Sequence, residues 1–275
     1  MKIRVISGIA LGIMLAVTLF GGGYLTAGVL LIVSLLAYHE LASALSFSVK
    51  NGDAGRLEVV GMAAIILHYL LMVITGGDMK YFVMLIMLLF VANAAIIVFD
   101  YPKISSDKVI ASVFSFVYAP MMLSFIYLLR IMPNGKFFAW IPFIAWVCDT
   151  CAYFAGNLLG KHKLCPKLSP KKTVEGAVGG VLGSALVGVL FGYIYANYGN
   201  VETDIVRSVV SFVIITVVAS AISQIGDLIA SAIKRDHDIK DYGKVIPGHG
   251  GIMDRFDSVI FITPVIYFMA TYFFK

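Results

Sequence analysis

The chain has 275 residues, of which 60% are hydrophobic and only 13% are charged. Soluble domains contain about 45–50% apolar and about 25% charged residues, so this composition excludes soluble enzymes, DNA-binding modules and disulfide scaffolds. The net charge of +5 is weak evidence for nucleic acid, because basic residues in a membrane protein report its topology and its contacts with anionic headgroups. We therefore expect membrane lipids, and no nucleic acid, as partners.

Apolar stretches long enough to cross a hydrocarbon layer of about 30 Å recur along the sequence. They lack the alternation of barrel strands, so we predict an all-α polytopic membrane protein with about nine transmembrane helices. The predicted spans are residues 5–21, 24–47, 57–75, 79–99, 109–132, 137–160, 174–197, 206–233 and 257–274. We treat 1–275 as a single transmembrane domain, in which 1–135 form the N-terminal helices and 136–275 carry the motifs. The basic start of the chain resembles a signal peptide, but we interpret it as the first anchor.

The distribution of positive charge predicts the orientation of these spans. If the N-terminus lies in the cytoplasm, all but five of the 21 basic residues fall inside, the exceptions being Lys80, Arg130, Lys136, Arg207 and Lys275. We predict a protein of the cell (inner) membrane with its N-terminus inside and its C-terminus outside. The two most polar loops, 161–173 and 234–256, then share the cytoplasmic face, where we expect the active site.

Three cysteines, Cys148, Cys151 and Cys165, are an odd number without the spacing of a disulfide framework. Cys148 and Cys151 lie within an apolar run rather than between elements of a redox or zinc fold. We expect these side chains to act as small apolar filler.

Two aspartates lie inside predicted helices, where a charge costs at least about 2.5–3.5 kcal/mol and is normally kept for a partner or a function. Asp149 begins a helical stripe that continues through Tyr153, Gly156, Asn157 and Gly160. Asp227 shares a face with Ser223, Ser231 and Lys234, and we interpret it as a cation ligand. The alternatives are a helix-packing contact for Asp149 and an ion pair with Lys234 for Asp227.

The loop that begins at Lys161 carries five lysines just before the next helix. Ser169 is a predicted N-cap, with Pro170 at the first helical position. Lysines beside the positive end of a helix favour a bound anion, so we predict a phosphate site here. The alternative is that the lysines only orient the chain.

The segment 231–258 is the densest in polar residues. Pro247 and the glycines that follow it allow a tight backbone whose N–H groups can reach phosphate oxygens. Asp254 and Asp257 are one helical turn apart and can face one metal ion. Carboxylates without a cysteine or histidine cluster favour Mg²⁺. Either aspartate is alternatively an N-cap, Asp257 more readily than Asp254.

These segments together resemble the signature of the phosphatidate cytidylyltransferase, or CDP-diacylglycerol synthase, family. The main block contains Ser231, Lys234-Arg235, Lys240-Asp241, Pro247-Gly248-His249-Gly250-Gly251 and Asp254-Arg255-Phe256-Asp257. Two other blocks run from Asp149 to Gly176 and from Ser223 to Asp227. The resemblance covers residues 145–258. In the N-terminal half only the hydropathy aligns, together with the intramembrane pair His39-Glu40, which resembles an acidic residue often found there in the family.

The resemblance implies that CTP and phosphatidic acid condense to CDP-diacylglycerol and pyrophosphate, with Mg²⁺, in a homodimer. It implies metal ligation by Asp227 and Asp254, followed by Asp257 and Asp149, and leaves a second cation open. The implied catalytic residues are Asp227, Asp254, Lys234, Arg235 and Arg255. The implied substrate-binding residues are Lys171, Lys172, Ser169, Thr173, Glu175, His249, Gly250, Gly251 and Ser223. The alternative for His249 is a structural role in its flexible loop.

Two other functions compete with this one. A CTP-dependent lipid or polyprenol kinase uses a similar nucleotide site but directs attack at the γ-phosphorus. A cation-coupled transporter accounts for the intramembrane aspartates but leaves the two basic loops unexplained. The D-G-x-x-A-R pattern of CDP-alcohol phosphotransferases does not occur in the sequence.

Overall fold

The computed structural model describes residues 12–13, 15–199, 204–248 and 250–274. Eight helical spans in this part of the chain are long and apolar enough to cross a membrane. They match the last eight predicted spans and confirm the all-α membrane fold, whereas the predicted span 5–21 lies largely outside the described residues. The longer helices are α2 (Gly23–Ala44), α3 (Gly55–Thr75), α4 (Met79–Phe99), α5 (Ser106–Phe116), α6 (Met122–Ile131), α8 (Ile144–Leu159), α9 (Val174–Tyr198), α10 (Ile205–Asp236) and α11 (Met253–Phe273). Short helical turns occur at η1 (Val49–Ala54), η2 (Val117–Met121), α7 (Gly135–Phe138) and η3 (Ile141–Phe143).

The helices group into two compact units that interleave along the chain. The first unit contains the described residues of 1–128 together with 236–255, and the second contains those of 129–235 together with 256–275. The polar segment between α10 and α11 therefore belongs with the N-terminal helices. The sequence-based division at residue 135 stays a prediction.

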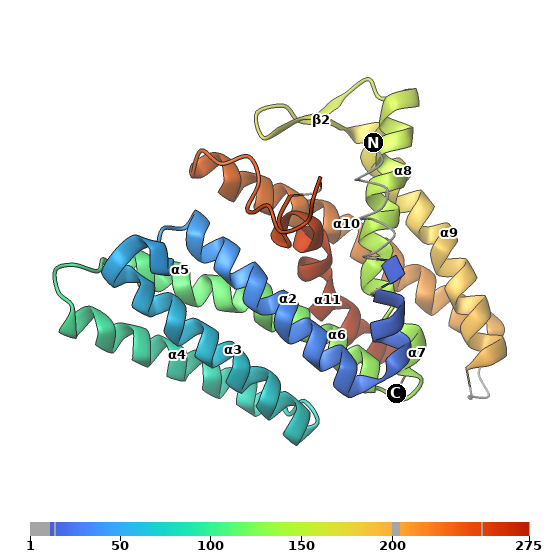
Figure 1. Ribbon diagram of the computed structural model, residues 1–275. Coiled ribbons are helices and arrows are strands. Elements are labelled where there is room, and N and C mark those ends of the chain that lie inside the picture. Colours follow the sequence, from blue (N-terminus) through green and yellow to red (C-terminus); the bar gives the residue numbers. More distant parts are fainter. Residues whose placement is uncertain (1–11, 14, 200–203, 249, 275) are drawn as a thin grey trace. The chain divides into compact units, whose positions relative to one another are not determined.

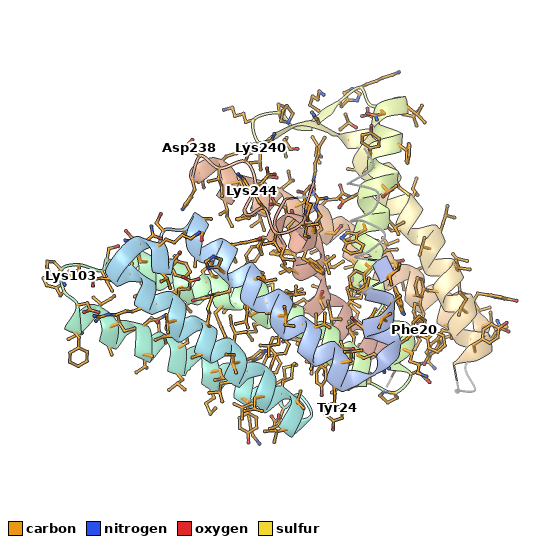
Figure 2. All side chains as sticks on the ribbon, in the orientation of Figure 1. Phe20, Tyr24, Lys103, Asp238, Lys240 and Lys244 are labelled. Carbon is orange, nitrogen blue, oxygen red and sulfur yellow. The ribbon has the colours of Figure 1, made fainter. Side chains whose placement is uncertain are left out.

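Hydrogen bonds between side chains link the helices of the first unit, where α2, α3 and α4 run side by side (Figure 1). Ser112 on α5 bonds through its Oγ to Tyr38 Oη of α2 at 2.7 Å and to Asn93 Nδ2 of α4 at 3.0 Å. Polar groups within hydrocarbon find their partners inside the protein. Tyr24 and Lys103 lie at opposite ends of this helix group (Figure 2).

Small residues bring α8 and α9 into close contact in the second unit (Figure 1). Gly176 and Gly180 on the buried face of α9 approach α8, whereas Gly188 and Gly192 farther along approach α10. A Cβ added at Gly180 would lie 2.8 Å from Cys148 Sγ of α8. Cys148, Cys151 and Cys165 are free thiols, and Cys148 is buried against Gly180, which confirms its expected role as small filler.

A two-stranded hairpin, β1 (Lys163–Cys165) and β2 (Ser169–Thr173), precedes α9. The helix begins at Val174, and Thr173 is its N-cap, because Thr173 Oγ1 accepts the Gly176 N–H at 3.1 Å. The prediction of Ser169 as the N-cap was therefore wrong. Ser169 pairs with Cys165 in the antiparallel ladder, and a proline at position 170 is compatible with an edge strand.

The packing of α8 against α9 predicts that Gly179→Ala destabilises the protein. The new Cβ would collide with the Ala155 Cβ on α8, and overpacking of this kind costs about 1–3 kcal/mol. We expect a lower thermal unfolding temperature in detergent. The control is Gly28→Ala on α2, where the added Cβ meets no atom within 4 Å. Equal unfolding temperatures for the two variants would contradict close packing at Gly179.

Candidate active site

A cavity of about 520 Å³ opens in the second unit among α8, α9, α10 and the hairpin. Its volume falls within the range of small-molecule sites, roughly 300–1,000 Å³. The cavity is lined by Asp149, Ala152, Tyr153, Gly156 and Asn157 of α8 and by Gly160, which follows the helix end. The structure therefore brings the whole predicted α8 stripe to one cavity wall.

The charged residues of this cavity come from the hairpin, α8 and α10. Lys163, Lys171 and Lys172 line it, as does Asp227. Lys172 Nζ forms an ion pair with Asp227 Oδ2, and each side chain is 26% exposed. The pair joins β2 to α10. The sequence analysis considered Lys234 as an ion-pair partner of Asp227 and did not predict Lys172. Residues 172 and 227 are too far apart in the sequence for any spacing to indicate this contact.

Glu175, in the first turn of α9, holds the start of the hairpin. Its Oε2 accepts the N–H groups of Lys161 at 3.1 Å and His162 at 3.2 Å. Its Oε1 lies 2.6 Å from His162 Nδ1. A carboxylate in the first turn also interacts favourably with the helix dipole. The structure thus gives Glu175 an anchoring role, and its predicted contact with substrate stays a prediction.

Thr173 occupies the point where the hairpin meets both helices. Cβ atoms added at Gly156, Gly160 or Gly176 would each approach its Oγ1 within 3 Å. These glycines therefore leave room for the Thr173 side chain as well as for the cavity, which Thr173 also lines.

Some polar and small residues of α10 pack against neighbouring elements, and others line the cavity. Ser223 is buried, and its Oγ donates to the Ser220 carbonyl at 2.8 Å. A Cβ at Gly226 would lie 2.7 Å from the Phe261 Cβ, so this glycine admits α11. Gln224, which the sequence analysis missed, lines the cavity and donates to the Ala177 carbonyl at 3.2 Å. Its position three residues before Asp227 on a helix was the available signal.

In the segment between α10 and α11, backbone N–H groups that were predicted to bind phosphate instead donate to a carboxylate of the same segment. Asp254 Oδ2, in the first unit, accepts the N–H groups of Tyr242 at 2.8 Å and Gly251 at 3.1 Å. Gly250 has a φ of +87°, which favours glycine. His249 lies outside the described residues. Figure 2 labels three residues of the same segment, Asp238, Lys240 and Lys244.

The remaining predicted residues lie in the last turn of α10 and in the first turn of α11. Lys234 and Arg235 occupy the last turn of α10, where positive charge is favourable. Arg255 is exposed in the first turn of α11. Asp257 is buried, and its Oδ1 accepts the Ser258 N–H at 2.7 Å. Catalytic and ligand roles for these residues stay predictions.

The donor atoms of the cavity fit Mg²⁺ better than zinc. Within the described ranges, no cluster of three or more His, Cys, Asp or Glu side chains stands ready to hold a metal ion. Asp149 and Asp227 nevertheless line one cavity, and Mg²⁺ commonly takes one or two carboxylates together with water and substrate phosphates. Asp254 belongs to the other unit, so its predicted sharing of a metal with Asp227 is untested.

Comparison with known proteins supplies an independent observation. The sequence model of the cytidylyltransferase family matches residues 2–273. Phosphatidate cytidylyltransferases of Staphylococcus epidermidis and Staphylococcus aureus (strain COL) are 33% identical over 276 residues and 30% identical over 275 residues, and each match covers 97% of both chains. The enzyme of that name from Bacillus subtilis is 34% identical over 130 residues, which are 47% of this chain and 45% of the relative.

The Lys172–Asp227 contact predicts energetic coupling in a double-mutant cycle. We expect Lys172→Met and Asp227→Asn each to lower stability, and the double variant to lose less than the sum by about 0.5–3 kcal/mol. Unfolding in detergent measures all four proteins. Lys171→Met is the matched control, because Lys171 is the exposed neighbour on the same strand. Additive losses for Lys172 and Asp227 would show that the ion pair contributes nothing to stability.

Proposed function

Because this chain belongs to the cytidylyltransferase family, we propose that it transfers the cytidylyl group of CTP to phosphatidic acid. The products are CDP-diacylglycerol and pyrophosphate, and the reaction serves phospholipid biosynthesis. The observation that carries this proposal is a cavity that combines three hairpin lysines with two aspartates in a chain whose full-length relatives are named phosphatidate cytidylyltransferase.

The chemistry is a displacement at phosphorus. A phosphate oxygen of phosphatidic acid attacks the α-phosphorus of CTP, the bond from that phosphorus to the bridging α–β oxygen breaks, and pyrophosphate leaves. The step needs no covalent protein nucleophile, because alignment of the reactants and neutralisation of their charge lower the barrier. Lys163, Lys171 and Lys172 bring three ammonium groups to the cavity, where they are suited to hold the phosphate groups.

Mg²⁺ is the proposed cofactor, with Asp227 and Asp254 as ligands, Asp257 and Asp149 as further candidates and a second cation left open. When bound, it supplies charge neutralisation at the phosphate oxygens. The proposal requires Lys172 to release Asp227, which frees the Lys172 ammonium group for a substrate phosphate.

The setting proposed for this reaction is the cytoplasmic side of the cell membrane. The distribution of lysine and arginine supports an N-terminus inside and a C-terminus outside. A homodimer is proposed on the family resemblance alone.

The destination of the CTP phosphates tests the proposed reaction. We expect label at the α-phosphate of CTP to enter lipid, and label at the γ-phosphate to leave as pyrophosphate. Thin-layer chromatography of the lipid and aqueous products measures both fractions, with phosphatidic acid omitted as the control. Lipid that carries γ-label would identify a kinase instead.

Replacement of the proposed metal ligands predicts a loss of turnover. Loss of an electrostatic contact in the transition state costs about 10²–10³ in rate, so Asp227→Asn and Asp254→Asn should each lose at least that much. If Asp227 serves only as the partner of Lys172, the double variant with Lys172→Met should regain activity; the metal role predicts that it stays inactive. Near-normal turnover in either single variant removes that residue from the metal site.

Labelling of single cysteines tests the proposed orientation. In a variant with the three native cysteines replaced by alanine, Lys167→Cys and Lys244→Cys should react with an impermeant maleimide only from the cytoplasmic side. Asp204→Cys should react only from the opposite side. Labelling of positions 167 and 244 from different sides rules out a common cytoplasmic face for the two basic loops.

A further inference from the structure

Glu40 places a buried carboxylate of α2 at the start of α11, inside the first unit. Glu40 is only 3% exposed. Glu40 Oε1 accepts the Ile252 N–H at 3.0 Å, and Oε2 accepts the Met253 N–H at 2.8 Å. The first N–H groups of a helix have no partner within it, and a negative charge there also interacts favourably with the helix dipole. Glu40 therefore acts as a cap supplied by a residue 213 positions away in the sequence.

The Glu40 carboxylate explains why two positions of the segment 231–258 are glycines. A Cβ at Gly243 would collide with Glu40 Oε1, and a Cβ at Gly251 would collide with both Glu40 oxygens. The backbone thus approaches the carboxylate as closely as glycine permits. These glycines serve the contact with α2, in addition to any contact with substrate.

The Glu40 contact is continuous with the contacts of Asp254. Asp254 follows Met253 directly, and its Oδ2 accepts the N–H groups of Gly251 and Tyr242. Glu40 holds the two N–H groups that lie between Gly251 and Asp254 in the chain. The position of the Asp254 backbone therefore depends on Glu40.

We propose that Glu40 is a positioning residue for cytidylyl transfer, which fixes the backbone of Ile252 and Met253 against α2 and thereby directs the Asp254 carboxylate. The inference rests on the proposed function, because it concerns the orientation of a residue assigned to catalysis. It extends that function to the N-terminal half of the chain, for which the sequence resemblance named no role.

Hydrogen exchange and kinetics of Glu40→Gln and Glu40→Ala test this proposal. In the substrate-free protein, we expect the Ile252 and Met253 amides to exchange about 10- to 100-fold faster in Glu40→Ala, because bonds to a charged acceptor are lost. Glu40→Gln keeps one acceptor oxygen and should fall between Glu40→Ala and the unmodified protein. A displaced reacting group costs about 10² in rate, so kcat should fall by about that factor in Glu40→Ala while KM for CTP changes less than about threefold.

Glu58→Gln is the matched control. Glu58 is also a buried carboxylate of the first unit, but it accepts the Val49 N–H at 2.5 Å and contacts His39 Nδ1 at 2.5 Å. Glu58→Gln should speed exchange near residue 49 and leave both exchange at 252–253 and kcat unchanged.

Three results would overturn the proposal: unchanged exchange at 252–253 in Glu40→Ala, normal kcat despite faster exchange, or an equal loss of kcat in Glu58→Gln. Circular dichroism and unfolding temperature identify variants that fail to fold, and Glu40→Gln then carries the test. If the unmodified protein transfers no cytidylyl group, the proposed function fails, whereas exchange at 252–253 still reports the Glu40 contact.

Discussion

The cost of an unpaired charge among membrane-spanning helices is the constraint on which this structure depends. A carboxylate in such a setting needs a partner within the protein. Glu40 accepts the N–H groups at the start of α11, and Glu58 accepts the Val49 N–H and contacts His39. Asp227 forms an ion pair with Lys172. Each carboxylate thereby joins segments that the sequence separates, so these charges determine which backbone segments pack together within each unit.

Carboxylates also hold the polar loops at the ends of the helices. In the second unit, Glu175 and Asp227 hold the hairpin that carries the lysines, the first through backbone N–H groups and the second through Lys172. In the first unit, Asp254 accepts the N–H groups of Tyr242 and Gly251, and Glu40 accepts those of Ile252 and Met253. Each loop is thus held by carboxylates of its own unit. In the hairpin, the proposed reaction breaks the Lys172–Asp227 contact but needs no change in the Glu175 contacts.

The sequence predicted the spans well, because an apolar run of sufficient length has few alternatives to a membrane helix. It also predicted the α8 stripe, since helical spacing places Asp149 and Gly160 on one face. It failed where long-range pairing overrides local signals. Ser169 looked like an N-cap, but the β1–β2 ladder moved the helix start to Thr173. The contacts of Lys172 with Asp227 and of Glu40 with Met253 left no local signal, because each joins segments that only the tertiary fold brings together.

The most direct test of the central claim is a stoichiometric assay of the purified chain in lipid micelles. CTP, phosphatidic acid and Mg²⁺ are supplied together and then omitted one at a time. The account predicts one CDP-diacylglycerol and one pyrophosphate for each CTP consumed, no product when any component is missing, and recovery when Mg²⁺ is restored after chelation. Release of CDP with phosphorylation of the lipid, or product formed without Mg²⁺, would contradict it.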